Sequence, residues 1–265
     1  MTDDMTLDPS ARRRDRMRFF RVAAAHRRNG ASDVLLGAML AFVAGGMNAG
    51  GFLAIGQYTS HMTGIISGVS DNLVLGNFQL IGGAALAVVA FTVGAAVSAI
   101  LINWGRRNAR ARQYAFPIAI EAVLLLGFGI VGSIGQGQPG FVNIAAPLLC
   151  FIMGLQNATI TKISGARMRT THVTGIVTDI GIELGKLVYW HRDRSKDSRH
   201  VVVADRQKLR MLAEVLGMFA LGGVVGAFGF GTLGYVFAVP LAAMLLTLAL
   251  PPLLKAALQE HRRRP

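Results

Sequence analysis

The sequence has little charge and almost no cysteine. Only 15% of its 265 residues are charged, whereas soluble domains carry about 25%, so the chain has too little polar surface for a soluble protein. The only cysteine is Cys150, which excludes an intrachain disulfide and a thiolate-bound metal cluster. Phosphate-binding glycine loops with lysine, His-Glu-x-x-His helices and Gly-x-Ser-x-Gly motifs are absent too. We therefore expect no enzyme, no cofactor and no metal site.

Long apolar runs dominate the chain instead. Hydrophobic residues make up 52% of it and the mean hydropathy is +0.48. Six stretches are close to the ~20 residues that a helix needs to cross a bilayer. We predict an all-α, polytopic membrane helix bundle with one transmembrane domain, 33–254, between a basic tail at 1–32 and another at 255–265. The six predicted spans are 34–57, 80–102, 116–134, 141–161, 211–230 and 232–254.

The net charge of +13 comes from the tails and connections, with eight arginines in residues 1–32 alone. That tail suits either an amphipathic helix on anionic lipid or a disordered cytoplasmic segment. Lys and Arg collect on the cytoplasmic side of membrane proteins. We therefore expect cytoplasmic termini, contact with the lipid bilayer and with anionic lipid at the tails, and no nucleic-acid partner. The sequence leaves open whether copies form a homo-oligomer.

A short polar motif occurs twice, as SHMTG at Ser60–Gly64 and as THVTG at Thr171–Gly175. An asparagine in the preceding apolar stretch comes 13 residues before the first histidine and 15 before the second; these are Asn48 and Asn157. A repeated element of this kind indicates a duplicated architecture.

The segments that follow the two motifs are predicted not to cross the membrane. Residues 64–76 form a helix of only ~20 Å, against a hydrocarbon core of about 30 Å. If neither this segment nor 172–190 crosses, every strongly basic connection falls on the cytoplasmic side. We therefore predict six transmembrane helices plus two short re-entrant or half-spanning helices. With three spans per unit, the units 33–134 and 141–254 form an inverted 3+3 repeat.

The two motifs are the candidate substrate site. A threonine at a helix start can cap it, and free N–H groups there favour an anion or a carbonyl oxygen. Histidine exchanges protons near neutral pH. The alternative is a structural role for the same residues. In that case each histidine forms a hydrogen bond across the repeat interface and each asparagine forms one between helices. The candidate binding residues are Asn48, His61, Thr63, Gly64, Asn157, His172, Thr174 and Gly175.

Acidic residues in apolar surroundings are candidates for proton or ion coupling, because ionised groups are costly at membrane depth. Asp71, Asp179 and Glu183 are the candidates. A pair between Glu183 and Lys186, three residues apart, is the structural alternative. Glu121 and Glu214 each lie about one turn or slightly more inside a span. They are functional candidates on the same ground, and reaching the interface is the structural alternative for both.

The phrases GFLAIGQYTSHMTG and NATITKISGARMRTTHVTGIVTDIGIELG resemble the hallmark segments of the YoaK-like family, known as domain of unknown function 1275. The resemblance covers residues 33–254 and implies a bacterial inner-membrane protein. It implies no substrate and no catalytic residues.

From the paired motifs and the predicted inverted repeat we expect a transporter or channel for a small polar or anionic solute. The sequence leaves open whether transport is linked to protons. The rival is a sensor or scaffold within the membrane that transports nothing.

Overall fold

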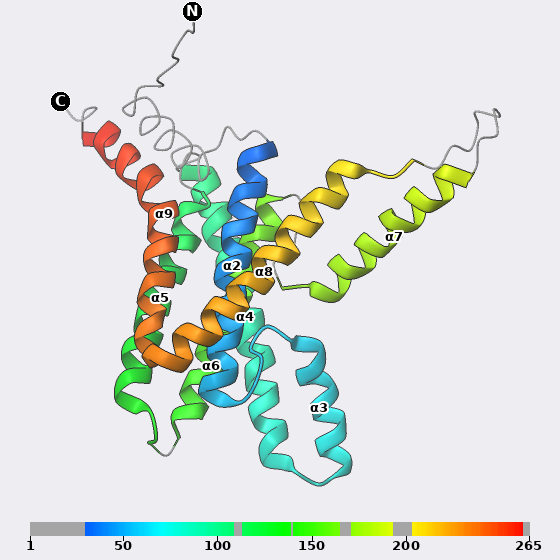
Figure 1. Ribbon diagram of the computed structural model, residues 1–265. Coiled ribbons are helices and arrows are strands. Elements are labelled where there is room, and N and C mark those ends of the chain that lie inside the picture. Colours follow the sequence, from blue (N-terminus) through cyan, green and yellow to red (C-terminus); the bar gives the residue numbers. More distant parts are fainter. Residues whose placement is uncertain (1–29, 109–112, 139, 165–170, 193–202, 262–265) are drawn as a thin grey trace, which may run out of the picture.

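The computed structural model describes residues 30–108, 113–138, 140–164, 171–192 and 203–261 (Figure 1). Within these ranges every regular element is a helix, which confirms the predicted all-α class. The elements are α2 (Gly30–Ile55), α3 (Met62–Val74), α4 (Phe78–Asn108), α5 (Ala115–Gly135), α6 (Phe141–Ile163), α7 (Val173–Arg192), α8 (Arg206–Leu233), the 3₁₀ helix η2 (Gly234–Phe237) and α9 (Ala238–His261).

In the part of the chain that the structure describes, five segments are long and apolar enough to cross a membrane, and the last of them, Arg206–Leu254, has 49 residues. A straight helix of that length would measure ~74 Å, more than twice the thickness of the hydrocarbon core. The chain instead breaks at Gly234, whose φ of 61° lies in the left-handed region, and α8 and α9 form a hairpin (Figure 1). The predicted boundary between the last two spans, 211–230 and 232–254, is wrong, because α8 continues to Leu233.

The structure describes the two predicted tails to different extents. Residues 1–29 lie outside the described residues, and so does the predicted lipid contact of that tail. At the other end α9 continues to His261, so most of the predicted tail 255–265 extends the last helix.

Helices α2 and α8 pack closely because glycines leave room at their crossing. A Cβ atom added at Gly45 on α2 would collide with the carbonyl oxygen of Phe219 on α8. A Cβ atom added at Gly222 on α8 would collide with the carbonyl oxygen of Phe42 on α2. Each helix thus contributes a Phe-x-x-Gly segment, and each glycine faces the partner's phenylalanine backbone. Such small-residue contacts let transmembrane helices approach closely.

Helices α4 and α6 repeat this arrangement. A Cβ atom at Gly94 on α4 would meet the carbonyl oxygen of Phe151, and one at Gly154 on α6 would meet that of Phe91. The crossing is again two Phe-x-x-Gly segments set against each other. The α2–α8, α4–α6 and α5–α9 pairs are the most extensively packed in the described structure.

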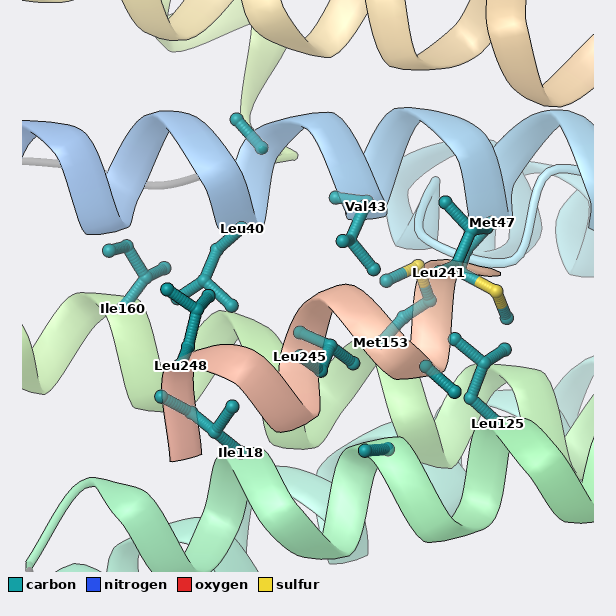
Figure 2. Close-up of a cluster of buried hydrophobic side chains, with 14 of the residues drawn as sticks. Leu40, Val43, Met47, Ile118, Leu125, Met153, Ile160, Leu241, Leu245 and Leu248 are labelled. Carbon is teal, nitrogen blue, oxygen red and sulfur yellow. The ribbon is translucent and has the colours of Figure 1, made fainter. Parts of the chain in front are cut away.

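The core lies where α2, α5, α6 and α9 meet (Figure 2). Its side chains come from all four helices and are fully or almost fully buried; they include Leu40, Val43, Met47, Ile118, Leu125, Met153, Ile160, Leu241, Leu245 and Leu248. A smaller cluster of Ile65, Ala87 and Cys150 joins α3 to α4 and α6. Helix α3 is thereby held against the bundle, beside α4 (Figure 1).

The structure separates Glu121 from Glu214. Glu214 is partly exposed and pairs with Arg210 at 2.8 Å. Glu121 is 0% exposed, which rules out for it the structural alternative of reaching the interface. It lies on the face of α5 that is covered by the core, with Ile118 and Leu125 one turn away on either side.

Candidate functional site

The first motif folds back into the bundle. After α2 ends at Ile55, the chain returns so that both the backbone N–H and the hydroxyl of Ser60 donate to Asn48 Oδ1, at 3.3 and 2.9 Å. Asn48 lies seven residues before the end of α2, which is ~10 Å along a helix. Ser60 and the neighbouring His61 therefore lie about two turns inside the end of α2.

The second motif is tied back in the same way. The Thr171 hydroxyl donates to Asn157 Oδ1 at 2.8 Å, and Asn157 lies six residues before the end of α6 at Ile163. The Asn157 amide nitrogen donates to the Met153 carbonyl at 2.9 Å, which leaves the amide oxygen for Thr171. In both halves, then, the asparagine of the preceding span holds the residue just before the motif histidine.

Helices α3 and α7 begin at this depth and run toward opposite ends of the bundle (Figure 1). His61 occupies the N-cap position of α3 but makes no side-chain capping bond. The prediction that Thr63 caps this helix is wrong, because Thr63 is its second residue. Thr174 is likewise the second residue of α7. The uncapped first turn of α3 presents backbone N–H groups, which attract an anion or a carbonyl oxygen.

A cavity of about 930 Å³ adjoins the start of α3. The loop after α2, one face of α3 and the first turns of α4 and α6 enclose it. Its polar lining consists of amide, hydroxyl and imidazole side chains, with no Lys, Arg, Asp or Glu: Gln57, Tyr58, Thr59, His61, Asn72, Gln79 and Asn143. Such a lining suits a small polar solute without requiring a charge.

Two of the eight predicted binding residues, His61 and Gly64, line this cavity. A Cβ atom at Gly64 would stand 2.7 Å from His61 Nδ1, so the glycine leaves space for the imidazole. The three candidates of the second motif, His172, Thr174 and Gly175, are exposed and are not lining residues of this cavity. Their joint role in a single site stays a prediction.

The acidic candidates on α7 take part in a network with α8. Glu183 is buried and accepts from Lys186 Nζ and from the Asp205 backbone, both at 2.9 Å. The predicted Glu183–Lys186 pair is confirmed. Lys208 on α8 lies 3.4 Å from Asp179 and 3.9 Å from Glu183. The hydrogen bond from Lys186, followed by that from Asp205, lowers the pKa of Glu183.

This network fixes α7 to the start of α8, where Asp205 also caps the helix through the Lys208 backbone at 2.9 Å. Asp71 on α3 is exposed. That Asp71, Asp179 and Glu183 couple protons or ions stays a prediction. Within the described ranges, no three His, Cys, Asp or Glu side chains are grouped as a metal site would need.

Several residues of the site were not predicted. Ser60 and Thr171 bond to Asn48 and Asn157. The sequence offers a signal for this role, because each residue immediately precedes a motif histidine. The amides Gln57, Asn72 and Asn143 line the cavity, but they are scattered in sequence and share no spacing that marks them.

The family model for the protein of unknown function DUF1275 matches residues 36–250. The chain belongs to this family. The UPF0700 transmembrane protein RA0705 of Rhizobium meliloti (strain 1021) is 30% identical over 225 residues, which cover 84% of this chain and 88% of that protein. No solved structure matches the chain. This DUF1275 protein is therefore a multi-pass membrane protein, and the resemblance expected from its motifs is confirmed.

Proposed function

We propose that this DUF1275 protein is a transporter or channel for a small polar or anionic solute, without enzymatic activity. One observation carries the proposal: after α2 and again after α6, the chain folds back and bonds to an asparagine well inside the helix it has just left, Asn48 and Asn157. Non-helical backbone at membrane depth is tolerated where it is buried in protein or lines a watery cavity. Two such segments, each followed by a helix that starts at mid-depth, are typical of solute pathways.

The helix pairing supports an inverted 3+3 repeat. If α2 corresponds to α6 and α4 to α8, the α2–α8 crossing is the counterpart of the α4–α6 crossing. The register agrees: Phe42 and Gly45 on α2 match Phe151 and Gly154 on α6, and Phe91 and Gly94 on α4 match Phe219 and Gly222 on α8. The third helices, α5 and α9, then pack on each other, as a pseudo-twofold axis in the membrane plane requires.

The charge distribution supports an orientation with cytoplasmic termini in the inner membrane. The start of α2, the end of α4, the end of α6 and the end of α9 lie at one end of the bundle (Figure 1). Basic residues gather there, with Arg106 and Arg107 ending α4 and Lys162 ending α6. The connections at the opposite end, 56–61, 75–77 and 136–140, contain no Lys or Arg, as the positive-inside rule requires of the outer side.

The cavity beside His61 is the proposed solute site. Its neutral amide and hydroxyl groups bind a polar solute by hydrogen bonds, and the uncapped N–H groups at the start of α3 add attraction for an anionic or carbonyl group. His61 lies at this helix start and is placed to donate to or accept from the solute.

Uptake into proteoliposomes tests the proposal. Purified protein is reconstituted and supplied with a panel of small neutral and anionic solutes, with an internal pH dye to register proton movement. We expect saturable uptake of one solute class, lost in His61→Ala and retained in Gln138→Ala, an exposed residue outside the cavity. Uptake no greater than in empty liposomes, or unaffected by His61→Ala, would contradict the proposal.

A sensor or scaffold is the second candidate, and the exposed apolar side chains of α7 favour it. Val177, Ile182, Leu184 and Val188 are each about half exposed or more, between 48% and 73%. In this case α7 is a docking helix and the cavity conducts nothing. Cysteines placed at positions 61 and 64 would then stay shielded from water-soluble thiol reagents, whereas the transport proposal expects them to react.

A further inference from the structure

Glu121 is a buried carboxyl group that the proposed solute site does not use. It lies in α5 and is 0% exposed. The core residues Ile118 and Leu125 flank it on the same face of α5 and point toward α2, α6 and α9 (Figure 2). Both carboxyl oxygens are buried without a hydrogen-bond partner. An ionised carboxylate in this position would be desolvated and unpaired, which proteins avoid.

The neighbouring polar side chain is Gln156 on α6, which interacts with the Glu121 carboxyl. Gln156 is also 0% exposed, and its Nε2 donates to the Leu40 carbonyl of α2 at 3.1 Å. Turning the amide over would set its oxygen against the Leu40 carbonyl oxygen, so this bond fixes the amide orientation. Gln156 Oε1 is then a third buried acceptor without a donor.

A proton on Glu121 would supply the donor that these buried acceptors lack. Ionised, Glu121 offers only acceptors. Gln156 Nε2 has one N–H left beside its bond to Leu40 and can serve only one of them, so a carboxyl oxygen and Gln156 Oε1 stay without a donor. Protonated, the Glu121 carboxyl gains an O–H donor, and Gln156 Oε1 is an unoccupied acceptor in the adjacent side chain. We propose that Glu121 and Gln156 form a proton-binding site inside the helix bundle, in which the neutral carboxyl of Glu121 donates to Gln156 Oε1.

Among the residues that the structure describes, no charged group pairs with Glu121 in place of the proton. Helix α5 packs against α4, α6, α9 and η2, and Gln156 adds a contact with α2. The charged groups on these helices stand near their ends, and the other titratable groups are a thiol and a phenol: Asp33 on α2, Arg106 and Arg107 on α4, Cys150 and Lys162 on α6, Tyr235 on η2, and Lys255, Glu260 and His261 on α9.

The position of Gln156 on α6 has no polar counterpart on α2. Gln156 comes five residues after Phe151, and the residue five after Phe42 in the matching register on α2 is Met47. Met47 is apolar and lies in the core (Figure 2). Equivalent helix positions therefore carry a polar group in one half and an apolar group in the other, as expected for a specific site rather than a requirement of packing.

Release of the proton would leave a carboxylate between α5, α6 and α2 and would favour separation of these helices. The site thus links protonation to helix packing. Only its use in driving solute movement rests on the proposed function; proton binding itself does not.

Infrared spectroscopy of the purified protein tests the proposal. A protonated carboxylic acid has a C=O stretching band distinct from those of carboxylates and amides. At neutral pH we expect this band in the wild type, its loss in Glu121→Gln, and its retention in the control Glu214→Gln, which changes a partly exposed, ion-paired residue. In Gln156→Leu the band should shift to higher frequency, because the carboxyl loses its acceptor.

Absence of the band from wild-type protein at neutral pH would overturn the proposal, and this measurement needs no variant to fold. A band that persists in folded Glu121→Gln would overturn it as well. The infrared test and the uptake test can fail independently. A band without uptake supports the proton-binding site and contradicts the transport function. Uptake without a band supports the transport function and contradicts the proton-binding site.

Discussion

The two halves of the chain, α2–α5 and α6–α9, agree in their scaffold and differ in their surroundings. Both place a Phe-x-x-Gly segment at each main crossing, and both return a motif to an asparagine inside the first helix. They differ beside the motifs: α3 lies against α4 and encloses a cavity, whereas α7 leans away from the bundle (Figure 1). We infer that the shared features stabilise the fold and that the features found in one half alone serve the specific function.

The largest effect should come from the shared crossings. Gly45→Ala and Gly154→Ala each drive a methyl group into a backbone carbonyl, which cannot move aside without separating the helices. We expect each to lower the free energy of unfolding by about 2 kcal/mol or more, measured by denaturation in detergent. Gly217→Ala is the control, since a Cβ there has nothing within 4 Å and gains up to about 1 kcal/mol in helix propensity. Clearly different losses of unfolding free energy in Gly45→Ala and Gly154→Ala would contradict the equivalence of the α2–α8 and α4–α6 crossings.

The asparagine ties should have the next largest effect. Asn48→Ala removes the two hydrogen bonds that Ser60 donates. Asn157→Ala removes the bond from Thr171 and the bond to the Met153 carbonyl. At about 1 kcal/mol for each bond, we expect each variant to lose about 2 kcal/mol in the same denaturation assay. Gln138→Ala should cost nothing measurable. If neither asparagine variant differs from that control, the motifs are not held at depth by these residues.

The motif glycines sharpen the contrast between the halves. Gly64→Ala would push against His61 Nδ1, 2.7 Å from the new Cβ, whereas Gly175→Ala meets nothing within 4 Å. We expect Gly64→Ala to move the imidazole and reduce uptake several-fold with little change in stability, and Gly175→Ala to leave uptake unchanged. Equal uptake by the two variants would show that the cavity beside α3 is not the solute site.

The smallest effect should be the pH dependence of α7 docking. Because the hydrogen bond from Lys186, above all, lowers the pKa of Glu183 below its ordinary value of 4.5, the carboxylate stabilises the folded state fully above pH 4.5. This contribution is lost as the pH falls through the lower folded-state pKa. The protection factors of the α7 amides against hydrogen exchange should fall over that range. In Glu183→Gln the exchange should already be faster at neutral pH, and an unchanged rate there would count against the network.

Much of the architecture follows from patterns in the sequence. Apolar length alone predicts the helices that pack as α2, α4, α5 and α6, and the doubled motif predicts two short helices outside the spans. Because threonine is a common N-cap, the pattern favours Thr63 as the cap of α3, whereas the helix begins one residue earlier, directly after His61.

Other features depend on which helices become neighbours. The sequence contains five Phe-x-x-Gly segments, and only the packing of the helices shows which four place the glycine against another segment's carbonyl. Glu121 lies near the start of a span, and nothing local predicts that the surrounding helices bury it. The Glu183–Lys186 pair was predictable because both residues lie on one helix, whereas the contact with Lys208 required the docking of α8.

The most direct test of the central claim, that both motif segments re-enter, is the side from which their flanking positions are labelled. In a Cys150→Ala background, single cysteines at Gln57 and Asn77 bracket α3, and those at Lys162 and Arg206 bracket α7. With a membrane-impermeant thiol reagent, the account predicts that the first two react only from the outside and the last two only from the cytoplasm. If the members of either pair react from opposite sides, that helix crosses the membrane and the account is contradicted.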